Sequence, residues 1–172
     1  MRKVEVVPYE KKWSKLFQNE SNNIKNILGD LIVSIHHVGS TAIPNMDAKP
    51  VIDILIEVTE INKVDSFNKK MNNLGYIALG ENGILNRRFF SKGGNNRTHH
   101  IHIFETGNSE INRHLLFRDY LIAHPKDAKK YSLLKQRLAH EYPENIDMYI
   151  KGKDAFIKEL DKKAKEWKEN TL

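Results

Sequence analysis

The sequence predicts an α+β protein in which a mixed β-sheet is followed by a helical C-terminal third. Short apolar runs, typical of buried strands, are concentrated between residues 31 and 105. They are separated by helices and loops of uneven length, which disfavours a regular doubly wound sheet. After residue 106, apolar residues recur at helical spacing. We expect one domain over 1–172, with a sheet-containing core in roughly 1–106 and a helical part in 107–172.

Seven elements are predicted in the first part of the chain. The strands are short runs rich in Val, Ile and Phe, and the helices have apolar residues three and four positions apart. Gly29 and Gly75 follow the two helices, where glycine commonly ends a helix. In order, the elements are a strand over 3–8, a helix over 13–28, strands over 31–37 and 50–58, a helix over 64–74, and strands over 87–90 and 97–105.

The helical part has three apolar stripes. The first ends near His124–Pro125, because proline cannot continue a helix. The predicted helices cover 111–124, 128–138 and 156–167. Residues 168–172 are expected to fray.

The composition excludes several classes of protein. There is no cysteine, which rules out disulfides and thiolate metal sites. No apolar run approaches the ~18 residues of a membrane span, and no secretory signal begins the sequence, so we expect a cytoplasmic protein that does not cross a membrane. The Walker-type phosphate loop, the serine-hydrolase elbow and the zincin helix are all missing from the sequence.

The net charge of +6 favours an anionic partner, such as a nucleotide or another phosphorylated small molecule. Much of the excess is lysine scattered through the predicted helices, which is typical of a solvated surface. Because no aromatic and basic stripe suited to base stacking is present, nucleic-acid binding ranks last.

The candidate site begins where an apolar strand runs into Gly39–Ser40. Asp53 lies thirteen residues later inside a second apolar strand, on the face opposite Ile52 and Ile54. A Gly-Ser turn lets backbone amides approach a phosphate, and a nearby carboxylate can hold a cation against it. A carboxylate among isoleucines is costly to bury alone, so Asp53 is either a metal ligand or the partner of an arginine.

Two histidines form the second constellation. His100 and His102 share one face of the strand over 97–105, opposite Ile101 and Ile103. Two imidazoles at this spacing can reach one divalent cation, or one can contact phosphate while the other acts as acid or base. The alternative is a pair of hydrogen-bonded, partly exposed histidines. The functional interpretation gains weight if this strand lies beside that of Asp53.

Basic and small residues near these strands are candidates for phosphate binding. Thr41 can cap a short helix whose amides point at an anion, and Lys49 can add positive charge. Guanidinium groups suit bidentate phosphate contacts. A solvated edge strand explains Arg88 and Arg97 nearly as well, and Arg118 could instead form a structural ion pair with Asp119. The candidates are Gly39, Ser40, Thr41, Lys49, Arg88, Arg97 and Arg118.

Several ordered blocks resemble the GrpB-like proteins, a branch of the nucleotidyltransferase superfamily. The resemblance spans nearly the whole chain. It implies a nucleotidyltransferase-like mixed sheet flanked by helices, and a link to nucleotide metabolism, because some bacteria fuse such a module to dephospho-CoA kinase. The blocks are His37 to Pro44, Lys49 to Ile54, Arg87 to Phe90, Arg97 to His102, and His114 to Leu121, followed by Tyr131, Leu134, Lys135, Tyr149, Lys153, Phe156 and Ile157.

The superfamily resemblance also implies a chemistry. Working nucleotidyltransferases have a Gly-Ser turn and three carboxylates that hold two Mg²⁺ ions. Gly39–Ser40 and Asp53 match this pattern, whereas Leu55 occupies the second carboxylate position. The resemblance therefore implies Mg²⁺ or Mn²⁺ on Asp53, His100 and His102, with Asp53 and His102 as catalytic candidates for nucleotidyl or phosphoryl transfer. The alternative is a non-catalytic nucleotide- or phosphate-binding module with a degenerate metal site, and Leu55 leaves the choice open.

Overall fold

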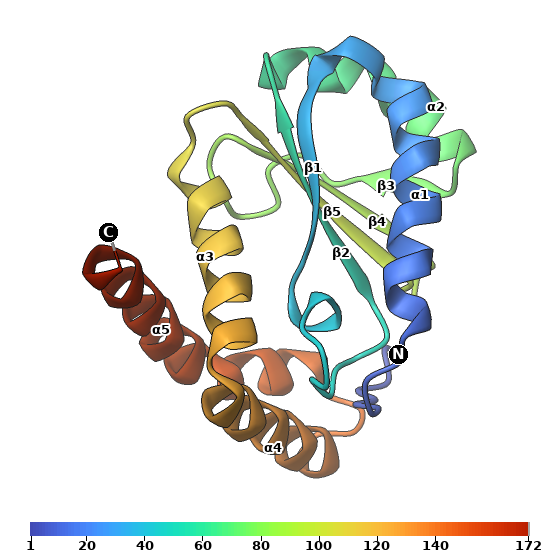
Figure 1. Cartoon of the computed structure of the whole chain (residues 1–172). Coiled ribbons are helices and arrows are strands. Elements are labelled where there is room, and N and C mark those ends of the chain that lie inside the picture. Colours follow the sequence, from blue (N-terminus) through green and yellow to red (C-terminus); the bar gives the residue numbers. More distant parts are fainter. Residues whose placement is uncertain (172) are drawn as a thin grey trace.

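The computed structural model describes residues 1–171, and Leu172 lies outside the described residues. One five-stranded sheet is surrounded by helices (Figure 1). In chain order the elements are α1 (Lys12–Leu28), the 3-10 helix η1 (Gly29–Leu31), β1 (Ile32–Val38), the 3-10 helix η2 (Ser40–Ala42), β2 (Ile52–Val58), the 3-10 helix η3 (Ile61–Phe67), α2 (Asn68–Asn73), β3 (Tyr76–Ala78), β4 (Arg87–Lys92), β5 (His99–Glu105), α3 (Ser109–Ala123), α4 (Pro125–Glu141) and α5 (Ile146–Asn170).

The sheet has the strand order β1-β2-β5-β4-β3. Strands β2 and β5 are parallel, and the other pairs are antiparallel. In the parallel pair Asp53 lies beside His100, and Leu55 lies beside His102. The predicted α+β class is therefore confirmed, and the strand of the two histidines is the neighbour of the Asp53 strand.

The alternation along β2 separates two apolar clusters. The side chains of Ile52, Ile54 and Ile56 are buried with those of α1, η3 and α2. On the opposite face Leu55 packs against Ile111 of α3. Helices α1 and α2 thus cover one face of the sheet and α3 the other, while α4 and α5 pack beside α3 (Figure 1). No helix within residues 1–171 is long and apolar enough to span a membrane.

Three predicted elements differ from the structure. Residues 3–8 form no strand. The Val4 amide donates to the Pro143 carbonyl, and Val7 forms only an isolated bridge with Ala48, so the two ends of this segment have different partners. The helix predicted over 64–74 is divided between η3 and α2.

The third difference concerns α5, which begins ten residues earlier than predicted and continues through 168–170. Its N-terminus is capped by the Asn145 side chain, which accepts from the Met148 amide. Gly152 interrupts the apolar pattern where α5 packs against α4, and a Cβ there would lie 2.5 Å from Leu138 Cδ2, so the Leu138 side chain would have to shift. The predicted fraying of Leu172 falls outside the described residues.

Candidate functional site

A cavity of about 220 Å³ lies beside Asp53, between the sheet and the C-terminal helices. We call it the Asp53 cavity. Six separate stretches of chain form its wall, so the site requires the complete fold. Its lining residues are Val38, Gly39, Ser40, Asp53, His102, Arg113, His114, Phe117, Tyr131, Lys153 and Ile157.

The Gly-Ser turn lies directly against the carboxylate. Gly39 has φ +72°, a conformation that side chains disfavour, and a Cβ on it would lie 2.6 Å from Asp53 Oδ2. Only glycine allows the backbone to approach so closely. The predicted meeting of the turn with Asp53 is therefore present in the structure.

Asp53 is held by the two histidines of β5. Its Oδ1 lies 3.1 Å from His102 Nε2 and 3.7 Å from His100 Nδ1. Burial raises the pKa of the Asp53 carboxyl, but the imidazole N–H groups of both histidines outweigh burial and hold that pKa well below its usual range. Asp53 is therefore an anion at neutral pH.

Two arginines fix the tautomers of these histidines. Arg87 Nη1 donates to His102 Nδ1 at 3.3 Å, and Arg97 Nη1 donates to His100 Nε2 at 3.2 Å. Because a guanidinium can only donate, each neutral ring carries its proton on the nitrogen that faces Asp53. In this arrangement neither ring directs a lone pair toward a cation bound at Asp53.

The residues present do not fit the two-ion arrangement of the superfamily. Leu55, at the second carboxylate position, is fully buried beneath α3. Within residues 1–171, no group of three or more His, Asp or Glu side chains could hold a metal ion. The binding of a single Mg²⁺ or Mn²⁺ by Asp53, His100 and His102 stays a prediction.

Positive charge surrounds the single carboxylate. Lys153 of α5 and Lys49, which precedes β2, place their ammonium nitrogens 4.6 and 5.1 Å from the centroid of the Tyr149 ring. Burial lowers the pKa of Lys153 to about 8, and burial together with neighbouring cations lowers that of Lys49 to about 8. Lys49 also lines a second cavity, of about 200 Å³, with Arg2 and Arg97.

These four residues form what we call the cation cluster: Lys49, Lys153, Arg2 and Arg97. Among the ion pairs formed by residues 1–171, none joins a member of the cluster to a carboxylate. The arrangement is therefore electrostatically suited to an anion.

The structure divides the predicted phosphate-binding residues into three groups. Gly39 and Ser40 line the Asp53 cavity, whereas Lys49 and Arg97 line the second cavity. The remaining predicted residues, which line neither cavity, are Thr41, Arg88 and Arg118.

These three side chains have other partners. Thr41 lies inside η2 rather than capping it, and its hydroxyl lies 2.9 Å from His37 Nε2. Arg118 donates to the His37 carbonyl at 3.1 Å and pairs with Asp119, as the structural alternative proposed. Arg88 pairs with Asp65 of η3, beside the sheet face that α1 and α2 cover.

Sequence reasoning missed the contributions of the C-terminal helices. Lys135 and Lys153 lie within apolar stripes, the first between Tyr131 and Leu138 at helical spacing. A lysine on the buried face of an amphipathic helix is a signal that could have identified both residues. The other residues of the cavity wall without a predicted role are Arg113, His114 and Tyr131.

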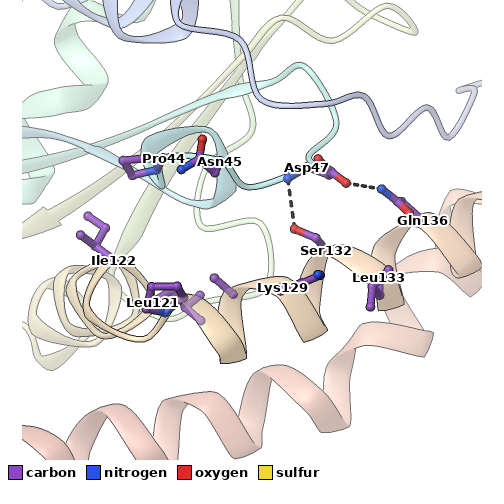
Figure 2. Close-up of a pocket in the computed structure, with 11 residues that line it drawn as sticks. Pro44, Asn45, Asp47, Leu121, Ile122, Lys129, Ser132, Leu133 and Gln136 are labelled. Atoms are coloured by element: carbon purple, nitrogen blue, oxygen red, sulfur yellow. Dashed lines mark hydrogen bonds between the residues drawn. The ribbon is translucent and has the colours of Figure 1, made fainter.

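A larger cavity, of about 510 Å³, lies elsewhere, between the turn at Pro44–Asp47 and helices α3 and α4 (Figure 2). Three of its polar residues, Asp47, Ser132 and Gln136, are hydrogen-bonded to one another. The Asp47 amide donates to Ser132 Oγ at 3.1 Å, and Gln136 Nε2 donates to the Asp47 carboxylate. The smaller Asp53 cavity is the better candidate for a functional site, because it brings the Gly39–Ser40 turn, Asp53 and the partly buried Lys153 together.

Comparison with known proteins shows the family of this chain. The family model described as GrpB protein matches residues 3–163. The chain belongs to the GrpB family. The resemblance of its sequence blocks to GrpB-like proteins is thereby confirmed.

Three individual proteins are similar to this chain in sequence, and one of them also in fold. The crystal structure of conserved protein GrpB from Enterococcus faecalis superposes with a TM-score of 0.91 at 43% identity, covering 95% of this chain and 99% of that one. UPF0157 protein YqkA of Bacillus subtilis is 54% identical over 97% of this chain, which spans only 49% of that relative. A dephospho-CoA kinase of Mycolicibacterium paratuberculosis is 25% identical over 98% of this chain and 47% of that protein.

Proposed function

We propose that this chain binds a phosphorylated small molecule, such as a nucleotide, with its phosphate end in the Asp53 cavity. The observation that carries the proposal is Lys153, the member of the cation cluster that lines this cavity, with Lys49, Arg2 and Arg97 in the neighbouring cavity. Partly buried cations without carboxylate partners are costly unless an anion joins them. The similarity to a dephospho-CoA kinase supports a nucleotide-related ligand.

The cavity volume supports binding of the phosphate end rather than of a whole nucleotide. Pockets for complete small molecules usually measure about 300–1,000 Å³, and the Asp53 cavity measures about 220 Å³. The phosphates would lie between Ser40 and Lys153, and the remainder of the ligand would extend out of the cavity.

Calorimetry with inorganic phosphate, pyrophosphate, ATP and dephospho-CoA tests the proposal. At least one of these compounds should bind saturably, and Lys153→Met should weaken binding at least about tenfold, as expected for a charge-assisted contact. Lys129→Met, which removes a lysine lining the larger cavity of Figure 2, should leave binding unchanged. Equal losses in the two variants, or no binding of any compound, would overturn the proposal.

Asp53→Asn distinguishes direct anion binding from binding through a divalent ion. If the phosphate contacts the cations directly, removing the Asp53 charge relieves repulsion and affinity should rise in buffer containing EDTA. If Mg²⁺ or Mn²⁺ bridges Asp53 and phosphate, the same substitution should abolish a metal-dependent affinity.

The second candidate function is nucleotidyl or phosphoryl transfer. It is favoured by the position of Gly39–Ser40 against Asp53, which is the geometry that the superfamily resemblance implied. Labelled ATP or GTP should then yield pyrophosphate or a labelled product in the presence of Mg²⁺ or Mn²⁺. Saturable binding without turnover across candidate acceptors would leave the binding module as the function.

A further inference from the structure

Ser40 has a buried lysine as its hydrogen-bond partner. Lys135 of α4 donates from Nζ to Ser40 Oγ at 2.8 Å, across 95 positions of sequence. The Lys135 side chain is 1% exposed, whereas Ser40 is partly exposed and lines the Asp53 cavity. The hydroxyl therefore faces the cavity while the amine lies behind it, away from solvent.

The surroundings of Lys135 favour the neutral amine. Lys153 of α5 and Lys49 repel a proton on Lys135, and Asp47 attracts one. No carboxylate within residues 1–171 lies within ion-pair distance of it. Burial, and then the charge of Lys153, lowers the pKa of Lys135 well below its ordinary value.

The aromatic neighbour does not supply a negative charge. The Tyr131 ring centroid lies 4.3 Å from Lys135 Nζ, and burial raises the pKa of the Tyr131 phenol, which stays protonated. Asp53 is occupied by the two histidines of β5. A neutral amine that is hydrogen-bonded to a hydroxyl can accept the hydroxyl proton, which is the arrangement of a serine–lysine catalytic pair.

We propose that Ser40 is a nucleophile and Lys135 its general base, acting on a phosphoric anhydride held in the Asp53 cavity. The Ser40 oxygen forms a bond to phosphorus while the bond from phosphorus to the bridging oxygen breaks. The Ser40 proton moves to Lys135 Nζ, which becomes an ammonium. The leaving group departs as a phosphate anion with the bonding electron pair, and Ser40 becomes phosphorylated.

The choice of phosphorus as the electrophile rests on the proposed function, because Lys153 lines the same cavity and suits an anionic substrate, whereas Arg113 is paired with Glu110 and Asp161. The activation of Ser40 by Lys135 does not depend on that choice. A neutral electrophile that reacts with activated serines therefore tests the pair without requiring nucleotide binding, so the two proposals can fail separately.

The test uses the full chain and a fluorophosphonate, in which Ser40 Oγ would displace fluoride from phosphorus. Peptide mass spectrometry should locate the adduct on Ser40, and the labelling rate should fall as pH is lowered and Lys135 becomes protonated. Lys135→Met should slow labelling about 10²-fold, the lower end of the usual general-base contribution. Ser132→Ala, which removes another buried hydroxyl of α4, should label at the wild-type rate.

Lys135→Arg provides the second variant, because it keeps a cation at the position but cannot accept a proton. It should label as slowly as Lys135→Met, with circular dichroism used to confirm that each variant is folded. If Ser40 stays unlabelled in the wild-type protein at every pH, the proposal is wrong. Labelling as fast in either Lys135 variant as in the wild type would also overturn it, and Lys135 would then have only a structural role.

Discussion

Gly39 is the residue whose backbone allows the turn and the carboxylate of the Asp53 cavity to meet. Its φ of +72° with ψ of −173° belongs to a region that is essentially restricted to glycine. A side chain at this position would be strained by its own backbone and would also contact Asp53. Both the close approach to Asp53 and the unusual backbone conformation therefore restrict this position to glycine.

Gly39→Ala should lower the free energy of unfolding by about 1–3 kcal/mol, the usual cost of such backbone strain. It should also abolish phosphate-ligand binding, since Asp53 must shift. Urea unfolding and calorimetry measure the two effects. Gly94→Ala is the matched control, because Gly94 also has a positive φ but a Cβ added to it would meet no other atom within 4 Å. Retained binding in Gly39→Ala would contradict the importance of the close approach.

Anion affinity should depend on pH through Lys49 and Lys153. Each binds an anion as the ammonium form, and each has a pKa lowered to about 8. Affinity for sulfate, which does not titrate in this range, should therefore be highest below pH 8 and fall as pH rises above it. Titrations at pH 7 and pH 9.5 measure the change. The double variant Lys49→Arg/Lys153→Arg should remove the dependence, because arginine stays charged.

Strand β2 shows how far the sequence predicts the site. The alternation of Ile52, Asp53 and Ile54 correctly placed the carboxylate opposite the apolar cluster, since side chains alternate along a strand. The neighbouring His100 could be placed on a face, but its pairing with β2 depends on a parallel register that no local pattern specifies. Lys135 was missed because helical periodicity alone assigned its stripe to a core, and Lys153 because the predicted helix began only at residue 156.

The same strand yields a test of the incomplete carboxylate pattern. Leu55→Asp restores the acidic residue of the superfamily at a position that is enclosed by Val38, Phe104 and Ile111. We expect no new Mg²⁺ site, because a carboxylate there is buried in an apolar cluster, and the free energy of unfolding should fall by more than about 3 kcal/mol. Thermal unfolding with and without Mg²⁺ measures both effects, and Leu55→Met should cost less than about 1.5 kcal/mol. A stabilising Mg²⁺ response would show that the metal site can be rebuilt.

At the scale of the whole molecule, the sheet and the helical part pack against each other through α3. Helix α3 packs on the sheet through Ile111 and on α4 and α5 through Tyr120 and Leu121. The cavity itself lies where these parts meet. We therefore expect the two parts to unfold as a single domain.

The two tryptophans report on the two parts separately. Trp13 is buried in the cluster on the α1 face, and Trp167 of α5 packs edge-on against Tyr120. In Trp13→Phe and in Trp167→Phe, the remaining tryptophan fluorescence should change at the same urea concentration as the far-UV circular dichroism. Separate midpoints within one variant would show that the helical part unfolds independently.

The residues of the Asp53 cavity are synthesised at different times. Ser40 and Asp53 leave the ribosome before Lys135 and Lys153, which belong to α4 and α5 and complete the site only when those helices have been made. A chain made only as far as α3 therefore has Asp53, Lys49 and Arg97 but lacks Lys135 and Lys153, the lysines that α4 and α5 bring to the site. The complete cavity therefore forms only after α5 has been made, and a bound ligand would hold α5 against β2, a strand made well before it.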